Sequence, residues 1–192
     1  MRKLSILTFV TADGVMQAPG HPDEDRSGAF DHGGWAASYW DEVMEQVMTE
    51  AMAEPYDLLL GRETYETFAS HWPHADDPVA KKLNGAMKYV VTSTENELEW
   101  KNSVKISGDI VEEIKQFKNQ DGPLLQVHGS WKLIQTLLTN DLIDEFRLWT
   151  FPLVIGSGKR LFADGSTLSN LKLTRTNSTS NGVIMSFYRL AH

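Results

Sequence analysis

The sequence predicts a single α/β domain, residues 1–192, with a mostly parallel sheet and an antiparallel C-terminal edge. Strand-like and helical segments alternate over roughly the first three quarters of the chain, and two strands end in a glycine that opens into a helix. The last quarter holds strand-like segments without helices. Alternation is typical of parallel sheets, and consecutive strands are typical of antiparallel ones. A length of 192 residues fits one domain.

Composition narrows the functional classes. The chain has no cysteine, which excludes disulfides, thiolate metal sites and a cysteine nucleophile. Its net charge is −8 and no Lys/Arg cluster forms a basic face, so nucleic acid is not expected as a partner. No apolar run reaches the roughly 18 residues of a membrane helix, and the start shows no signal-peptide pattern. We therefore expect a cytoplasmic protein without a membrane partner.

The first expected strand, residues 4–10, alternates in polarity and ends at the turn signal Asp13-Gly14. Residues 15–37 are rich in glycine and proline and show no periodicity, which is typical of a functional loop or of a disordered one. Ser38 is expected to cap a helix, with Asp41 at its capping-box position, that ends before Pro55.

Residues 56–60 form a short apolar strand closed by Gly61, and a helix is expected to begin at Arg62. A short helix at 79–83 and a β-branched strand at 87–92 follow. After a strand at 104–106, Asp109 is expected to cap a helix that ends at Gly122.

Residues 124–128 form the next strand, which Gly129 ends, and Ser130 is expected to cap a helix whose apolar positions follow one face. Residues 143–155, 171–177 and 183–190 have strand character and are joined by turns, with a hairpin signal at Asn181-Gly182.

Two motifs that resemble ligand sites are better explained as loops. Gly156-Ser157-Gly158-Lys159 lacks the other residues of a phosphate loop or a dinucleotide fingerprint, so a turn is expected there. Residues 71–77 hold two histidines and two aspartates, but Pro73 breaks the helix that would align the imidazoles. We expect no metal site.

The two strand–glycine–helix junctions point to nucleotide binding. Such a junction exposes unpaired backbone N–H groups and the positive end of the helix dipole, which together favour a phosphate group. Arg62 at the first junction could pair with a phosphate through two hydrogen bonds.

Several segments, in a fixed order along the chain, carry a resemblance to a known family. They are residues 9–15, 59–65, 88–93, 125–130, and 144–148 running into 151–162. Together they resemble the dihydrofolate reductase-like family, and more closely the branch with the reductase domain of the bifunctional riboflavin-biosynthesis deaminase-reductase. The resemblance implies a three-layer fold with an eight-stranded sheet flanked by helices, and an NADPH site in a cleft across the sheet.

The resemblance also assigns candidate cofactor residues in four groups. They are Arg62, Glu63 and Thr64 under the phosphates, Thr92, Ser93 and Thr94 near the 2′-phosphate, Gly129, Ser130 and Trp131 at the pyrophosphate, and Thr11, Ala12 and Asp13 beside the nicotinamide. His128 stands where the family usually has the first of two glycines, which puts one close backbone contact in doubt.

Asp41 has two alternative roles. Its position resembles that of the acidic residue that anchors the substrate in folate reductases, and this makes it the candidate catalytic residue. As part of the capping box, it would instead stabilise only the helix.

Together these features predict an NADPH-dependent reductase that transfers a hydride to a small conjugated C=N or C=O substrate. It would resemble the 5-amino-6-(5-phosphoribosylamino)uracil reductase of riboflavin biosynthesis. The alternatives are a dihydrofolate reductase and a non-catalytic nucleotide-binding dimer, the latter favoured if His128 blocks pyrophosphate binding. The apolar C-terminal strands predict a homodimer.

The charge of residues 14–55 bears on the substrate. Arg26 is the only basic residue there, against nine Asp or Glu. A neutral substrate therefore fits better than an anionic one, unless Lys159 or Arg160 reaches the pocket. The alternative is that these acids form a solvated helix face.

Overall fold

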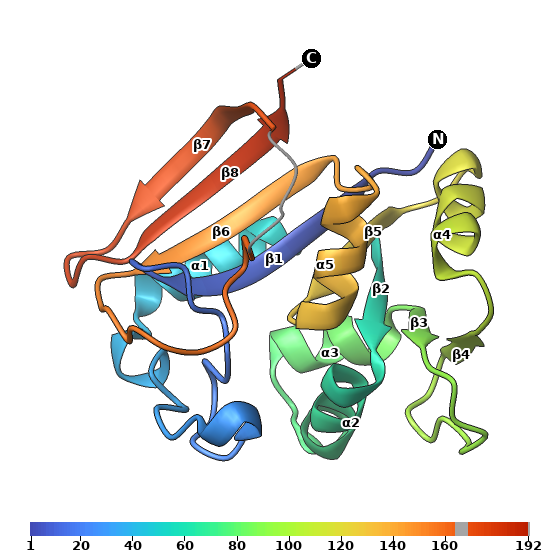
Figure 1. Cartoon of the computed structure of the whole chain (residues 1–192), viewed down its shortest axis with the longest axis horizontal. Coiled ribbons are helices and arrows are strands. Elements are labelled where there is room, and N and C mark those ends of the chain that lie inside the picture. Colours follow the sequence, from blue (N-terminus) through green and yellow to red (C-terminus); the bar gives the residue numbers. More distant parts are fainter. Residues whose placement is uncertain (164–168, 192) are drawn as a thin grey trace.

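The structure is a computed structural model that describes residues 1–163 and 169–191. In this part of the chain, eight strands form one sheet in the order β4-β3-β2-β5-β1-β6-β8-β7 (Figure 1). The strands are β1 Leu4–Thr11, β2 Tyr56–Gly61, β3 Lys88–Val91, β4 Ser103–Ile106, β5 Leu124–His128, β6 Glu145–Phe151, β7 Leu171–Ser178 and β8 Ile184–Leu190.

The sheet is parallel except at its C-terminal edge. β1 lies between β5 and β6 and pairs in parallel with both, and β2, β3 and β4 extend the parallel part. β8 pairs antiparallel with β6 and with β7. The predicted fold class, mostly parallel with an antiparallel C-terminal edge, is therefore confirmed.

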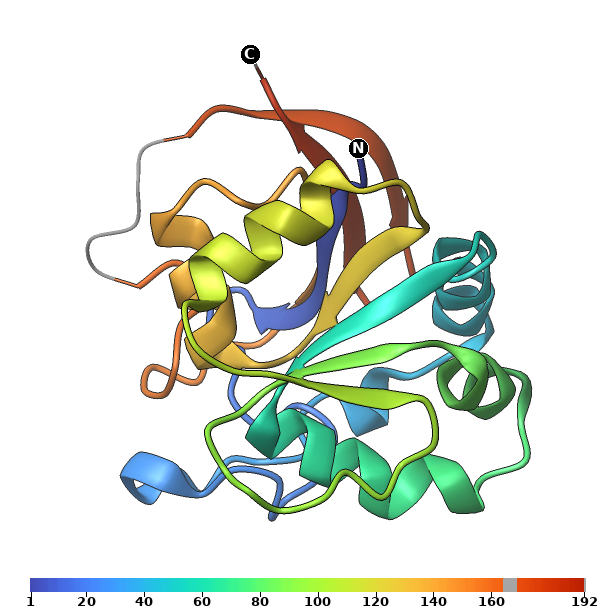
Figure 2. The ribbon, with the colours of Figure 1, turned by 90° about the vertical axis from the view of Figure 1, so that its right-hand side faces the viewer.

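Five α-helices cover the two faces of the sheet in the described part of the chain (Figure 2). They are α1 Glu42–Ala51, α2 Arg62–His71, α3 Pro78–Gly85, α4 Ile110–Asn119 and α5 Trp131–Thr139. None of them has the length and apolar character needed to cross a membrane. The result is three layers, with helices on both sides of the sheet.

Two hydrophobic cores separate these layers. One joins the sheet to α1, α2 and α3, and includes Met44 and Leu83. The other joins the sheet to α4 and α5, and includes Ile114 and Ile134. Successive side chains of β1 point to opposite faces of the sheet and so pack in different cores. Leu7 lies in the first core, while Ile6 and Val10 lie in the second. This explains why the strand pattern was readable from the sequence.

The start of α1 differs from the prediction. Residues Ala37–Tyr39 form a separate 3₁₀ helix, and α1 begins at Glu42 with Asp41 as its N-cap. Asp41 has an extended backbone, and its Oδ1 accepts a hydrogen bond from the Met44 N–H at 2.9 Å. The predicted capping box that begins at Ser38 is therefore wrong, because the aspartate itself occupies the preferred cap position.

The strand expected at 143–155 is also shorter, ending at Phe151. Beyond it, the N–H groups of Ile155 and Gly156 donate to the carboxylate of Asp13 at 3.3 and 2.8 Å. A side-chain acceptor has replaced the neighbouring strand, so the backbone groups are satisfied without a ladder.

Lys88 on β3 is a fully buried cation. Its Nζ donates to the carbonyl oxygens of Asn84, Ala86 and Lys101, each at 3.0 Å, and lies 4.2 Å from the centroid of the Trp100 ring. Burial lowers the pKa of Lys88 to about 8. The lysine thus joins the C-terminal end of α3 to the segment that enters β4.

We expect Lys88→Met to lower the free energy of unfolding by about 2–4 kcal/mol, because three carbonyl groups lose their donor. Urea unfolding at neutral pH measures this loss. Lys105→Met, at an exposed position of β4, is the matched control and should change stability by less than about 0.5 kcal/mol. Equal losses in the two variants would contradict a structural role for Lys88.

Candidate functional site

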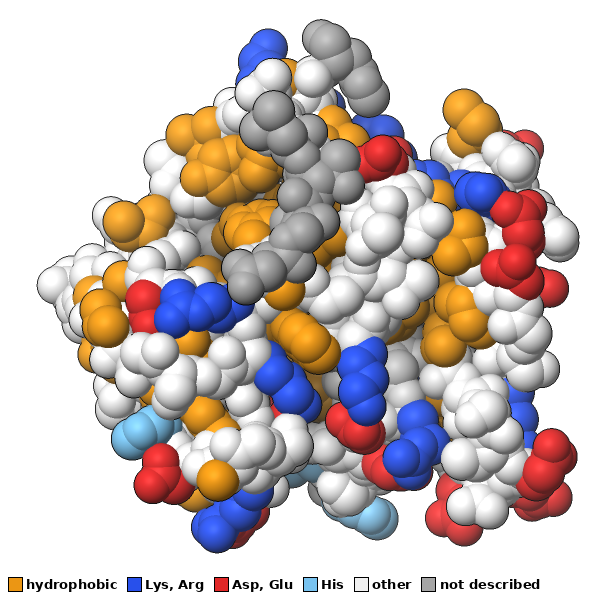
Figure 3. Space-filling view, in the orientation of Figure 1, with side chains coloured by type: hydrophobic (Ala, Val, Ile, Leu, Met, Phe, Trp, Pro, Cys, Tyr) orange, Lys and Arg blue, Asp and Glu red, His pale blue; other side chains and the backbone are white. Residues whose placement is uncertain are grey.

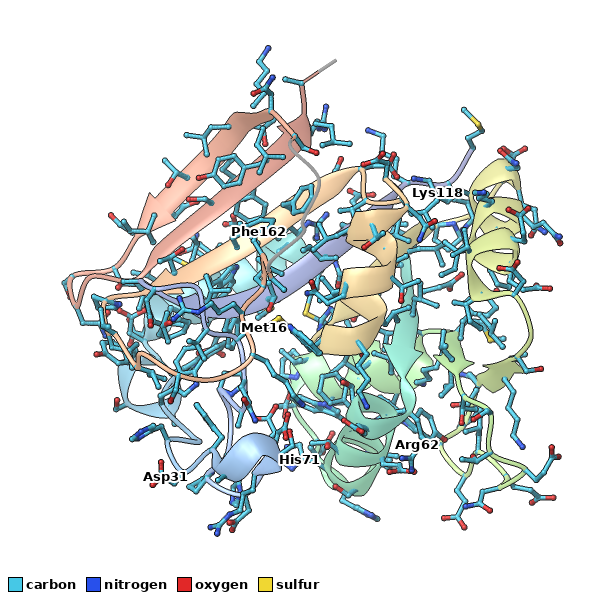
Figure 4. All side chains as sticks on the ribbon, in the orientation of Figure 1. Met16, Asp31, Arg62, His71, Lys118 and Phe162 are labelled. Atoms are coloured by element: carbon cyan, nitrogen blue, oxygen red, sulfur yellow. The ribbon has the colours of Figure 1, made fainter. Side chains whose placement is uncertain are left out.

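A cleft of about 1630 Å³ opens toward the carboxyl ends of the parallel strands. Its walls come from β1, from residues 16–25, from α1, and from the junctions that follow β2, β3 and β5. In Figure 4, Met16 follows β1 on one side of this region, while Arg62 and His71 begin and end α2 on the other. Ligands of open α/β sheets bind at this end of the strands, so the position is that of a binding site.

The first predicted phosphate site lies in this cleft. α2 begins at Arg62, directly after Gly61, and no side chain caps its N-terminus. Arg62, Glu63 and Thr64 all line the cleft. The Arg62 guanidinium pairs with Glu66 at 3.0 Å, but both side chains are about half exposed. Such an exposed ion pair contributes little to stability and is easily broken, so Arg62 remains able to bind an anion.

The second junction meets the first. Gly129 and Ser130 both have left-handed backbones, with φ of +57° and +62°. The Ser130 Oγ accepts a hydrogen bond from the Gly61 N–H at 2.9 Å instead of capping α5. A Cβ on Gly129 would lie 3.6 Å from Thr64. Because β2 and β5 are neighbours in the sheet, the N-termini of α2 and α5 open side by side into the cleft.

Some of the remaining predicted cofactor residues line the cleft, and one lies behind a lining residue. Trp131, Thr92 and Ser93 line the cleft. Thr94 is not among its lining residues, but its hydroxyl lies 3.2 Å from that of Thr92. The structure therefore brings together three of the four predicted groups.

The fourth group, Thr11, Ala12 and Asp13, is not among the lining residues in the described part of the chain. Asp13 accepts from the Thr11 hydroxyl at 2.5 Å and from two N–H groups after β6, and its carboxylate lies 3.6 Å from Arg160. The Thr11 hydroxyl holds the pKa of Asp13 below its usual range, with help from the two N–H groups. This cluster joins the end of β1 to the loop after β6, and Leu7, Thr8 and Phe9 are the residues of β1 that line the cleft.

Asp41 lies outside the lining as well, and the acidic side chain of α1 in the cleft is Glu45. Glu45 was missed in the sequence analysis. It stands one turn after Asp41, on the same helical stripe as Met48, Thr49 and Met52, which also line the cleft. The spacing i, i+3, i+4, i+7 is a signal that could have found it.

His128 is buried and lines the cleft, and its ring lies on the face of the sheet that packs against α2. Its Nε2 lies 2.6 Å from Gln126 Oε1, so the ring is directed back along β5. The ring packs against Tyr56 and Phe68 at centroid distances of 6.5 and 6.2 Å. Burial lowers the pKa of His128 to about 4, with a smaller contribution from Arg147, so the imidazole is neutral at pH 7.

The glycine-rich segment after β6, where a turn was predicted, bends at Ser157 and Gly158. Gly156 and Gly158 have φ of +87° and +118°, and a Cβ on Gly158 would lie 2.9 Å from Phe30 and Val15. The missing side chain lets the turn pack on the long loop, and Lys159 reaches the cleft from there. Among the described residues, no group of three or more His, Asp or Glu is placed to hold a metal ion.

Comparison with known proteins identifies the family. Residues 2–185 match the model of the RibD C-terminal domain. The chain belongs to this family. The uncharacterized protein YyaP of Bacillus subtilis (strain 168) is 33% identical over 136 residues, which cover 68% of this chain and 72% of YyaP.

Solved structures share the fold of this RibD C-terminal domain. A candidate riboflavin biosynthesis protein from Shewanella sp. PV-4 has a TM-score of 0.66 at 18% identity, with both chains covered completely. Dihydrofolate reductase from Enterococcus faecalis, solved with NADP(H), has a TM-score of 0.63 at 12% identity, covering 99% of this chain and 97% of that one. The predicted dihydrofolate reductase-like fold is therefore confirmed.

The cap at Asp41 makes a testable prediction. Asp41→Ala should lower the free energy of unfolding by about 1 kcal/mol, because the Met44 N–H loses its acceptor. Asp41→Asn keeps a carbonyl acceptor and should stay close to the wild type. Chemical unfolding measures both, with exposed Glu42→Ala as the control. If Asn destabilised as much as Ala, the negative charge rather than the cap bond would be the important feature.

Proposed function

We propose that this protein is an NADPH-dependent reductase that transfers a hydride to a small conjugated C=N or C=O substrate. The observation that carries the proposal is the meeting of two uncapped helix N-termini in one cleft, joined by the hydrogen bond from Gly61 to Ser130. Membership of the RibD C-terminal domain family and a fold shared with a reductase solved with NADP(H) support it.

The donors at the two junctions fit the phosphates of a dinucleotide. The first N–H groups of a helix have no partner within the helix, and the helix dipole attracts an anion to them. At α2 these groups belong to Arg62, Glu63 and Thr64, and at α5 they begin with Trp131 behind Gly129 and Ser130. These six residues would hold the phosphate groups of the cofactor.

The other cofactor residues would contribute at the two ends of the dinucleotide. Thr92 and Ser93 would offer hydroxyl groups to the 2′-phosphate, with Thr94 supporting Thr92. Thr11, Ala12 and Asp13 would act on the nicotinamide side by holding β1 against the loop after β6. When bound, the cofactor supplies the hydride, and the protein supplies binding, orientation and exclusion of water.

The position of His128 favours catalysis over the non-catalytic alternative. That alternative would be favoured if the imidazole blocked pyrophosphate binding. Because the ring is hydrogen-bonded to Gln126 and packed on Tyr56 and Phe68, it lies on the face of the sheet that α2 covers, whereas α5 covers the opposite face. We assign the acidic contact on the substrate side to Glu45, which lines the cleft, while Asp41 positions α1 as its cap.

Cofactor choice tests this proposal. Wild type should bind NADPH more tightly than NADH, and Arg62→Ala should weaken NADPH binding by about 1.5–3 kcal/mol, since a charge-assisted contact is lost. Energy transfer from the 6 tryptophans to the nicotinamide reports binding. Lys115→Ala removes an equally exposed cation from α4, outside the cleft, and should leave the NADPH affinity unchanged.

Equal affinity of the wild type for NADPH and NADH would contradict the proposal that NADPH is the preferred cofactor. Turnover is scored separately, by oxidation of NADPH in the presence of a panel of small conjugated substrates. Tight NADPH binding without oxidation of NADPH by any panel member would favour the nucleotide-binding alternative.

We also propose a homodimer joined through β6, β7 and β8. Figure 3 shows apolar side chains gathered over these strands. Leu173 and Ile184 of these strands are about half exposed, whereas Phe146 and Phe151 of β6 are buried within the chain and cannot contribute to an interface. Apolar surface on a sheet edge is typical of a partner surface.

The dimer is expected to scatter light with twice the chain mass of 21.6 kDa. Leu173→Glu on β7 should shift the mass toward the monomer, because it places a charge in the apolar contact. Val104→Glu is the control, since Val104 is similarly exposed on β4 at the opposite edge of the sheet. A wild-type mass of 21.6 kDa at micromolar concentration would overturn the dimer.

A further inference from the structure

The cleft has two halves that differ in charge. The junctions after β2 and β5 contribute Arg62, Glu63 and Lys132. The other half, which we call the α1 half, is lined by β1, residues 16–25 and α1. Its described lining residues include four carboxylates and no Lys or Arg; the carboxylates are Asp23, Glu24, Asp25 and Glu45.

Lys159 is the cation that reaches the α1 half from the loop after β6, and it is already paired. Its Nζ lies 2.6 Å from Asp25 Oδ2, and both side chains are about three-quarters buried. Gln17 fixes both partners, because its Oε1 accepts from the Lys159 N–H at 3.0 Å and its Nε2 donates to the Asp25 carbonyl at 3.2 Å. An anion could therefore use Lys159 only by breaking a partly buried ion pair.

The other nearby cations are directed elsewhere. Arg160 donates to the carbonyl oxygens of Asp13 and Gly156, and it does not line the cleft. Arg26 pairs with Asp23 on the exposed side of the loop and does not line the cleft either. An anionic substrate would need Lys159 or Arg160 in the pocket. Lys159 reaches the pocket but brings no free positive charge, and Arg160 does not reach it.

The Glu45 carboxylate, in contrast, has no hydrogen-bond or ion-pair partner among the described residues. It is exposed, and it faces the cleft from the first turn of α1. Glu24 differs, since its carboxylate already accepts from the N–H groups of Gly20 and His21 at 2.7 and 3.2 Å. Glu45 is therefore the carboxylate that remains available to a ligand.

An aromatic wall lies in the same half, and its two lining rings, Phe9 and Trp40, are inclined at 47° to one another. Trp40 is 44% exposed and lines the cleft together with Phe9. Behind them, the buried Trp149 ring stacks on both, at centroid distances of 5.9 Å from Trp40 and 5.3 Å from Phe9. An aromatic face held in this way suits a planar ring, and it attracts cations.

We propose that the α1 half takes a planar nitrogen heterocycle that is uncharged or cationic, and that it rejects substrates with a phosphate or carboxylate group. This inference rests on the proposed function for its assignment of the α1 half to the substrate. A desolvated anion without a free cation is costly, and here it would also meet an unpaired carboxylate. The inference separates this protein from reductases that act on phosphorylated heterocycles.

A charge series on one ring system tests the selectivity by direct binding. The probes are proflavine as the cation, acridine as the neutral ring and acridine-9-carboxylate as the anion, titrated calorimetrically at neutral to slightly alkaline pH. Saturating NADPH occupies the junction half, and a parallel titration without NADPH is run. Wild type should bind proflavine and acridine at least about tenfold more tightly than the carboxylate.

Two lysine variants on one helix identify the cause. Glu45→Lys should reverse the order, admitting acridine-9-carboxylate and weakening proflavine. Glu42→Lys makes the same change of charge in the same first turn, but Glu42 is exposed outside the cleft lining, so the order should remain. Trp40→Ala should weaken all three probes by a similar factor, because the stacking surface is common to them.

Two results would contradict the inference. A wild type that binds the carboxylate as tightly as proflavine would overturn it, as would equal effects of Glu45→Lys and Glu42→Lys. Failure of NADPH to bind would count against the proposed function instead, and the titrations without NADPH would still report the charge order of the cleft.

Discussion

The hydrogen bond from the Gly61 N–H to the Ser130 Oγ joins the two strand–helix junctions on which the cleft depends. It forms because β5 lies between β2 and β1, although β5 follows both in the sequence. The left-handed backbones at Gly129 and Ser130 then direct α5 so that it begins beside α2. The order of the strands, more than any single side chain, therefore determines where the two uncapped helix N-termini of the proposed phosphate site lie.

The fold was predictable from the sequence because local patterns and tertiary structure agree. Successive side chains of β1 point to opposite faces of the sheet, and each face packs in its own core. Gly61 and Gly129 end their strands where the next helices begin. The exceptions lie at positions where a polar side chain replaces a regular partner. Asp13 accepts the N–H groups that would have extended β6, and Asp41 caps α1 three residues later than the position assigned to Ser38. Periodicity alone does not reveal such local competition for hydrogen bonds.

The candidate site was predictable only in part. Residues at the junctions could be assigned from short motifs, because a strand, a glycine and a helix are contiguous in the chain. The ion pair between Lys159 and Asp25 joins positions that are 134 residues apart, and the sequence gives no indication of it. Burial of Lys88 depends likewise on three carbonyl groups from two other segments. Such contacts come from the assembled fold, so they could not be read from composition or spacing.

The two halves of the cleft acquire their electrostatic character in different ways. At the junctions, the positive potential comes from backbone N–H groups and helix dipoles, so any sequence that adopts this fold with uncapped helices would present it. In the α1 half, the negative charge comes from side chains such as Glu45 and Asp25, which lie on a helix surface and a loop that the sheet does not constrain. Cofactor binding is therefore expected to follow the fold, while substrate choice follows these side chains. Family membership bears on the first half of the cleft, and the charge of the α1 half is the feature of this chain on which the proposed substrate selectivity depends.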